Sequence, residues 1–138
     1  MAADAEYAPA KVSEVGFVDE AGAEGVLLLR SESDRQTVLA MSSLPGEKAV
    51  HVERFSRGDR SSVPTAYNLV EELAERNGLH LAKVQVHPSR SVLKAKLHFK
   101  GREEDLVLDG YRASDAVAMA TLFDAPILVE RSLLQRRP

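Results

Sequence analysis

The sequence predicts an α+β fold: a single domain in which a mixed, mostly antiparallel sheet packs against two to three helices. Two observations carry this prediction. Short segments of alternating polarity, separated by Gly, Pro and Ser, are typical of antiparallel strands. Apolar residues spaced three to four positions apart indicate helices between and after these segments. A chain of 138 residues has the size of one ordinary domain.

The first part of the chain is expected to form a flexible tail and then an early three-strand meander. Residues 1–11 are rich in alanine and acidic residues and are interpreted as the tail. Residues 12–18, 25–30 and 36–41 are each apolar or alternating, with polar turns between them. Short strands joined by such turns pair in antiparallel fashion. The folded domain is therefore expected over residues 12–135.

Two helices are expected next. Residues 42–47 indicate a helix entry, with Pro45 suited to the first turn. Ser62 is a plausible N-cap of a second helix, which Gly78 ends. The second helix carries an apolar stripe at helical spacing, formed by Ala66, Leu69, Val70 and Leu73.

A long central hairpin follows, and the chain then returns to a helix and a buried strand. Residues 83–87 and 92–100 alternate at period two around a Pro-Ser-Arg-Ser turn, which is a strong hairpin pattern. Residues 105–109 form a further strand. An alanine-rich helix, apolar nearly all round and therefore buried, begins near Ser114, and residues 127–129 complete the sheet.

Composition excludes several classes of function. The chain has no cysteine, which rules out a disulfide framework and thiolate chemistry. No apolar run is long enough to span a membrane, and the first residues lack the features of a secretory signal, so we expect a cytoplasmic protein. The net charge is −3, but residues 51–138 hold fourteen basic and twelve acidic side chains. This mildly basic part permits phosphate contact without requiring it.

A basic stripe on the hairpin is a candidate nucleic-acid-binding surface. If the apolar positions of both strands face the core, the alternating polar positions share the opposite face. Basic side chains about 7 Å apart along a strand can follow a phosphate backbone. The alternative is a solvated sheet face, on which acidic residues of the next strand neutralise the lysines. The candidate binding residues are Lys83, Lys94, Lys96 and His98.

The four histidines show no spacing typical of metal ligands. Hydrolysis of a phosphodiester needs carboxylates that hold a metal, or a histidine that moves a proton. His87 and His98 lie on paired strands and could approach each other there. Each histidine is otherwise interpreted as a surface residue.

The segment from Arg112 to Ala120 carries the most chemistry. Ser114 is placed to cap the helix, and Asp115 lies in the first turn, where a negative charge is favoured by the helix dipole. A functional interpretation assigns Arg112 to a phosphate and Asp109 or Asp115 to a metal or a water molecule. The structural role at the helix start and the functional role do not exclude each other.

Residues 112–116 (Arg-Ala-Ser-Asp-Ala) and 125–129 (Ala-Pro-Ile-Leu-Val) resemble the C-terminal signature of the bifunctional nuclease family. The similarity extends in outline over residues 12–135. The sequence departs from the family pattern in four places, one of which is an extra residue between Asp109 and Arg112. Ala113 replaces a proline, Glu47 is displaced by about one position, and Ala66-Tyr67-Asn68 stands where the family has Thr-His-Asp.

The resemblance implies a nuclease that hydrolyses phosphodiester bonds in RNA and DNA with little sequence specificity. Asp115, Asp109 and Arg112 would be the catalytic residues, with a divalent cation such as Mg²⁺ as the expected cofactor. The competing hypothesis is a non-catalytic oligomeric module that binds nucleic acid or a protein partner. A homo-oligomer is expected in either case, because an apolar helix and open meander edges need cover.

Overall fold

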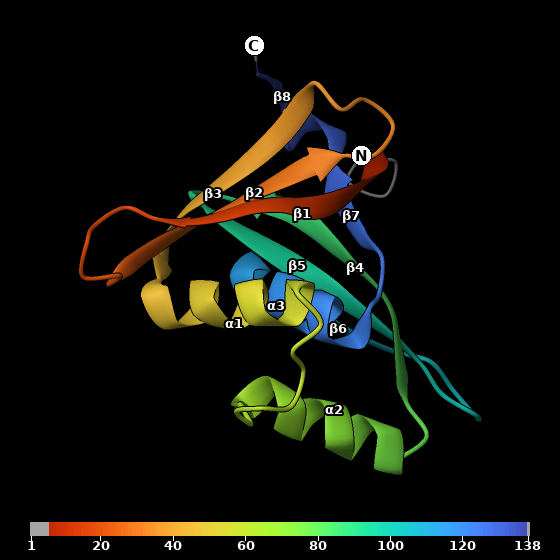
Figure 1. Cartoon of the computed structure of the whole chain (residues 1–138). Coiled ribbons are helices and arrows are strands. Elements are labelled where there is room, and N and C mark those ends of the chain that lie inside the picture. Colours follow the sequence, from red (N-terminus) through yellow and green to blue (C-terminus); the bar gives the residue numbers. More distant parts are fainter. Residues whose placement is uncertain (1–5, 138) are drawn as a thin grey trace.

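The computed structural model describes residues 6–137 and confirms a single α+β domain (Figure 1). Within that range, eight strands form one sheet in the order β6-β5-β4-β7-β1-β2-β3-β8. The strands are β1 (Tyr7–Phe17), β2 (Glu24–Ser31), β3 (Thr37–Pro45), β4 (His80–Ser89), β5 (Val92–Lys100), β6 (Leu106–Arg112), β7 (Ile127–Glu130) and β8 (Gln135–Arg136). The helices are α1 (Gly46–Ser56), α2 (Ala66–Arg76) and α3 (Ala113–Phe123), with a 3₁₀ turn, η2 (Arg131–Leu133). None of these helices is long and apolar enough to cross a membrane.

The predicted meander and hairpin are both confirmed, and β7 joins them into one sheet. β1, β2 and β3 pair in antiparallel fashion, as do β4 and β5. β7 lies between β4 and β1, parallel to the first and antiparallel to the second. β8 pairs with Thr37 and Val38 at the outer side of β3. The rest of that edge has no strand partner among residues 6–137, so an open meander edge remains a reason for expecting self-association.

The expected tail over residues 1–11 is wrong for residues 7–11, which form the first half of β1. Tyr7 to Ala10 pair with β7, and the side chains of Ala8 and Ala10 are buried. Small side chains at these two positions let β1 pass close to the core, so an alanine-rich segment is part of the sheet. Residues 1–5 of that expectation lie outside the described residues.

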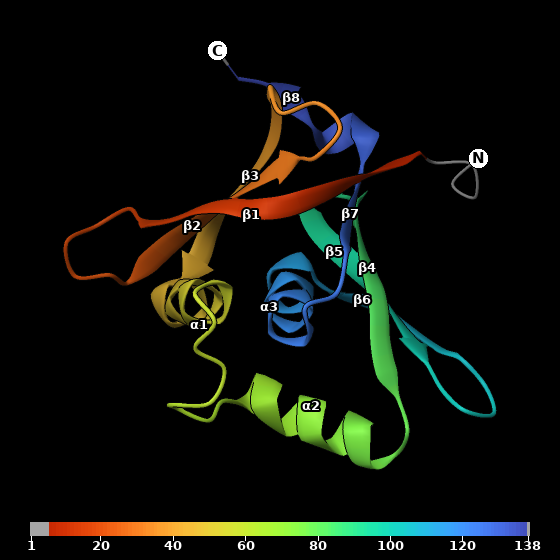
Figure 2. The same cartoon turned by 45° about the vertical axis from the view of Figure 1, so that its right-hand side comes forward.

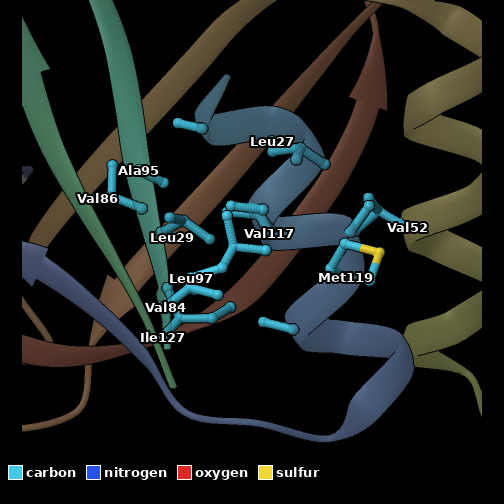
Figure 3. Close-up of a cluster of buried hydrophobic side chains, with 14 of the residues drawn as sticks. Leu27, Leu29, Val52, Val84, Val86, Ala95, Leu97, Val117, Met119 and Ile127 are labelled. Carbon is cyan, nitrogen blue, oxygen red and sulfur yellow. The ribbon is translucent and has the colours of Figure 1, made fainter. Parts of the chain in front are cut away.

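α3 is the central helix of the domain, as its all-round apolar pattern predicts. It packs on β4 and β5 on one side and against α1 on another. Figure 3 shows Val117 among side chains of the sheet and Met119 beside Val52 of α1. Nine of the eleven α3 residues are buried within this chain, so α3 itself needs no second copy to cover it.

The helix ends differ from the sequence predictions. α1 begins at Gly46, directly after β3. Thr65, not Ser62, caps α2, because its hydroxyl accepts the Tyr67 and Asn68 N–H groups in a capping box. Arg112 is the N-cap of α3 and makes no side-chain cap, so the cap predicted at Ser114 is wrong. The chain passes from β6 into α3 without a loop, and Ser114 already lies inside the helix.

α2 lies farther from the sheet than α1 and α3 in both views (Figures 1 and 2). Ala74 is its buried residue. The apolar stripe seen in the sequence is largely exposed, at 61% for Leu69, 42% for Val70 and 55% for Leu73. Amphipathic spacing therefore gave the right secondary structure here, but the apolar face is not covered by the rest of the domain.

Asp59 organises the loop between α1 and α2. Its carboxylate accepts hydrogen bonds from the Ser62 hydroxyl at 2.6 Å and the Ser62 N–H at 3.1 Å, and it pairs with Arg54 Nε at 3.3 Å. The Ser62 contacts first, and then Arg54, lower the pKa of Asp59 to about 2 from its ordinary 3.8. The ionised carboxylate thus holds the loop that leads into α2.

We expect Asp59 to contribute to stability only while it is ionised. Because its pKa is lower in the folded protein, the contribution is present above about pH 4 and is lost as the pH falls from 4 towards 2. Thermal unfolding of the wild type and Asp59→Asn measures this. The variant should melt at a lower temperature at pH 6, and the gap should close near pH 2. A gap that is constant with pH would contradict this role.

Candidate functional site

A cleft of about 940 Å³ lies between the three helices and the β5–β6 edge of the sheet. The end of β3 and the first turns of α1, α2 and α3 all reach it, which brings together residues about 20 to 70 positions apart. Apolar side chains form most of its wall. The polar and titratable side chains that line it are Glu47, Lys48, His51, Thr65, Tyr67, Tyr111 and Asp115.

Asp115 is the centre of the polar cluster. The Tyr67 hydroxyl donates to its Oδ1 atom at 2.6 Å, and the Lys48 Nζ atom lies 2.9 Å from the same oxygen. The Asp115 side chain is 37% exposed and that of Lys48 is 23% exposed. A half-buried carboxylate with one oxygen fixed by two donors is held in a single orientation towards the cleft.

Tyr67 is a permanent hydrogen-bond donor in this cluster. Burial, and next its hydrogen bond to Asp115, raise the pKa of the Tyr67 hydroxyl well above its ordinary value of 10. The hydroxyl therefore stays protonated at physiological pH. Edge-on packing against Phe55 and His51 of α1, with ring centroids 6.3 and 6.2 Å away, fixes the ring.

His51 is not the surface residue that the sequence suggested, because its side chain is only 15% exposed. Arg54 Nη1 lies 3.2 Å from His51 Nδ1. A guanidinium can only donate, so Nδ1 is the acceptor and Nε2 carries the proton. Nε2 points to Glu47 Oε1 at 3.4 Å. His51 thus joins Arg54 to the exposed carboxylate at the mouth of the cleft.

Asp109 and Arg112 do not lie in the cleft with Asp115. Asp109 is on the opposite face of the sheet, 3.4 Å from His87 Nε2. Partial burial opposes ionisation of Asp109, but hydrogen bonds from the Gly110 N–H and from His87 outweigh it and lower the pKa. Arg112 is exposed at the junction of β6 and α3, opposite Lys94 in the strand register. Of the three predicted catalytic residues, the cleft contains Asp115.

The four predicted nucleic-acid-binding residues do share one surface, here called the basic face. Lys83 pairs with His98 across β4 and β5, and Lys94 and Lys96 alternate with His98 along β5. Ala95 and Leu97, which lie between them, and Phe99, which follows His98, are buried. Burial, with Lys83 and Lys96 nearby, lowers the pKa of His98, whose Nε2 contacts Gln85 at 2.6 Å. The positive charge of this face is therefore carried by its lysines.

His87 and His98 do not approach each other as the hairpin had suggested. His87 is opposite Lys94 and turns to Asp109, whereas His98 turns to Gln85. Each histidine is thus already engaged by its own partner.

The donor set of the cleft does not fit a resident Mg²⁺ ion. Within residues 6–137 there is no group of three His, Asp or Glu side chains that could hold a metal. The Lys48 ammonium is at Asp115, where it would repel a second cation. Mg²⁺ prefers an octahedral set of oxygen ligands, which this cluster does not offer.

Lys48 and His51 were not identified as site residues from the sequence. Both lie one to four residues after Glu47 on a helix whose exposed face has other charged residues, so neither stood out. The contact between Tyr67 and Asp115 joins residues 48 positions apart, a distance over which periodicity gives no information. One sequence signal did point here, namely the departure from the family pattern at residues 66–68.

The fold and the polar cluster define a small α+β domain with a cleft built around one oriented carboxylate. The sequence model of the bifunctional nuclease domain matches residues 27–138, so this chain belongs to that nuclease-related family. No curated protein matches the sequence. The match to the family model confirms the suspected family, and the observed strands and helices confirm the predicted α+β class.

Two of the departures from the family pattern, at Glu47 and at residues 66–68, fall at or beside the cleft. Tyr67, at the place where the pattern has histidine, is the residue that donates to Asp115. Asn68, where the pattern has aspartate, serves the capping box of α2, and its Nδ2 donates to the Arg60 backbone carbonyl. Glu47, displaced in the pattern, lies at the cleft mouth. This chain therefore has its own version of the polar cluster.

Proposed function

We propose that this protein hydrolyses phosphodiester bonds in RNA and DNA, with the cleft around Asp115 as its active site. The observation that carries the proposal is the Lys48–Asp115–Tyr67 cluster, a carboxylate and an ammonium oriented together in an open cleft. Contacts to phosphate carry no base information, which accords with little sequence specificity. The family match supports the nuclease class.

The cluster suits attack by water on phosphorus. Both fixed contacts fall on Asp115 Oδ1, which leaves Oδ2 to take a proton from the attacking water. Lys48 can donate to a phosphoryl oxygen with its remaining N–H groups and stabilise the charge that develops there. As the bond to the leaving oxygen breaks, that oxygen takes a proton from solvent. Tyr67 keeps Asp115 in position and does not itself touch the substrate.

The basic face is proposed to bind the rest of the nucleic acid through its phosphates. Lys83, Lys94 and Lys96 offer charge without base contacts, which suits RNA and DNA alike. Arg112 extends this face to the β6 edge, next to the start of α3. Because β6 is an edge strand, a single chain of nucleic acid can pass from the basic face around it to the cleft. We place this activity in the cytoplasm.

The alternative is a non-catalytic oligomeric module. The exposed stripe of α2, formed by Leu69, Val70 and Leu73, favours it, since exposed apolar helix faces mark contact sites. A homo-oligomer is also compatible with catalysis. Light scattering on wild type and on Leu69→Ser/Leu73→Ser measures whether this stripe holds copies together.

The test is a cleavage assay on purified protein with single-stranded RNA and DNA of mixed sequence, in EDTA and in Mg²⁺. Because the cluster offers no metal site, cleavage of both substrates is expected in EDTA at a rate within about threefold of that in Mg²⁺. Binding that weakens with salt but produces no cleavage in either condition would support the non-catalytic module instead.

A further inference from the structure

Most of the cleft wall is apolar, which phosphate chemistry alone does not require. A phosphate and a water molecule would fill a small part of its 940 Å³. Covering an apolar wall that is open to water with an apolar ligand group is favourable, because apolar surface is then removed from water. The side chains beyond the polar cluster include Val63, Val70, Phe99, Leu108, Tyr111 and Met119.

Tyr111 is the most exposed aromatic side chain of this wall, at 54%. It reaches the cleft because β6 has a β-bulge. Leu108 pairs with Leu97, and Tyr111 pairs with Ala95. Residues 108 and 111 of β6, three positions apart, therefore lie opposite residues of β5 that are two positions apart. Gly110 makes the bulge with a φ of 85°, a backbone conformation that favours glycine. The extra residue puts Leu108 and Tyr111 on the same side, both facing the cleft.

We propose that this apolar wall receives an unpaired nucleobase, stacked on Tyr111, next to the phosphate held at Lys48. The inference rests on the proposed function and names its substrate class: single-stranded RNA and DNA. A nucleotide consists of a flat base, whose faces are apolar, and an anionic phosphate. The cleft offers an apolar wall with an exposed aromatic ring for the base and the oriented Lys48 ammonium for the phosphate. Stacking on an aromatic ring accepts every base, so sequence specificity stays low.

A duplex does not offer such a base. Its bases are paired and stacked on both sides, and extruding one would oppose binding because pairing and stacking are lost. A single strand pays little of that cost. The basic face can still contact duplex phosphates, so binding and cleavage should respond differently to strand pairing.

The first experiment varies the nucleic acid and leaves the protein unchanged. Binding, by fluorescence anisotropy, and cleavage are measured with three substrates of about 12 nucleotides, a length chosen to cover the cleft and the basic face. They are a single strand, its blunt duplex, and the same single strand carrying abasic sites. The single strand is expected to be cleaved at least about tenfold faster than the duplex, and abasic sites should weaken binding at least about fivefold. Equal behaviour of all three would overturn the proposal.

The second experiment removes the stacking surface. Tyr111→Ala should weaken single-strand binding at least about fivefold and abolish the difference between normal and abasic strands. Tyr111→Phe keeps the ring and should bind as the wild type does. Val92→Ala, on the neighbouring strand and matched in exposure at 53%, is the control and should change nothing. Thermal melting checks that each variant is folded.

The two proposals can fail separately. Base-dependent binding that Tyr111→Ala removes, without cleavage of any substrate, would support the base site and reject the nuclease. Cleavage that proceeds equally on single strand, duplex and abasic strand would keep the nuclease and reject the base site.

Discussion

Asp115→Asn is expected to lower the rate of phosphodiester cleavage by about a hundredfold or more. General-base catalysis contributes roughly that factor, and an amide cannot take the proton. Asparagine has the shape of aspartate and can still accept the Tyr67 hydrogen bond, so the cleft should keep its form. Cleavage rates of single-stranded RNA and DNA, with melting temperatures of both proteins, measure the effect.

The matched control is Asp109→Asn. Both aspartates lie near the β6–α3 junction and both were candidates from the sequence, but Asp109 is on the other face of the sheet, next to His87. Its loss should leave the cleavage rate within about threefold of the wild type. If Asp109→Asn abolishes cleavage and Asp115→Asn does not, the active site is not the cleft.

Gly46→Ala is expected to destabilise the fold by about 3 kcal/mol or more. A Cβ atom at residue 46 would lie 1.7 Å from the Gly22 carbonyl oxygen, which is backbone and cannot rotate away. The Gly46 N–H also donates to the Ala23 carbonyl at 2.9 Å. Relief of the clash must move the start of α1, and with it Glu47 and Lys48. Urea unfolding measures the stability, and the cleavage assay measures the site.

Gly16→Ala is the control for that substitution. An added Cβ at Gly16 would meet Val26 Cγ1 at 3.4 Å, an ordinary contact with a side chain. The free energy of unfolding should change by less than about 1 kcal/mol. Equal effects at residues 16 and 46 would mean that the loop before β2 yields easily and does not fix α1.

The elements with regular local patterns were predicted well. The β4–β5 hairpin follows from alternating polarity: β5 has its predicted bounds, 92–100, whereas β4 extends on both sides of the predicted 83–87 to residues 80–89. α3 and β7 follow from a helix that is apolar nearly all round and from the short apolar run at residues 127–129. In each of these, the local pattern and the tertiary environment favour the same conformation.

Elements whose conformation depends on distant partners were predicted less well. Residues 7–10 belong to a strand because β7, more than 110 positions later, pairs with them. The exposure of Leu69 and Leu73 depends on how far α2 lies from the sheet, which its own periodicity does not encode. The start of α3 depends on β6 running into it without a loop.

The sequence by itself determined the family, the α+β class, the basic face and Asp115 as a candidate, because strand alternation, helix periodicity and a short signature are local properties. Only the tertiary structure decided which candidates act together. It separated Asp115 from Asp109 by the thickness of the sheet and joined Asp115 to Lys48 and Tyr67. The physical reason is that packing between residues far apart in the sequence decides which face of the sheet a side chain lies on and where the first turns of the three helices meet. Such packing leaves no local pattern in the sequence.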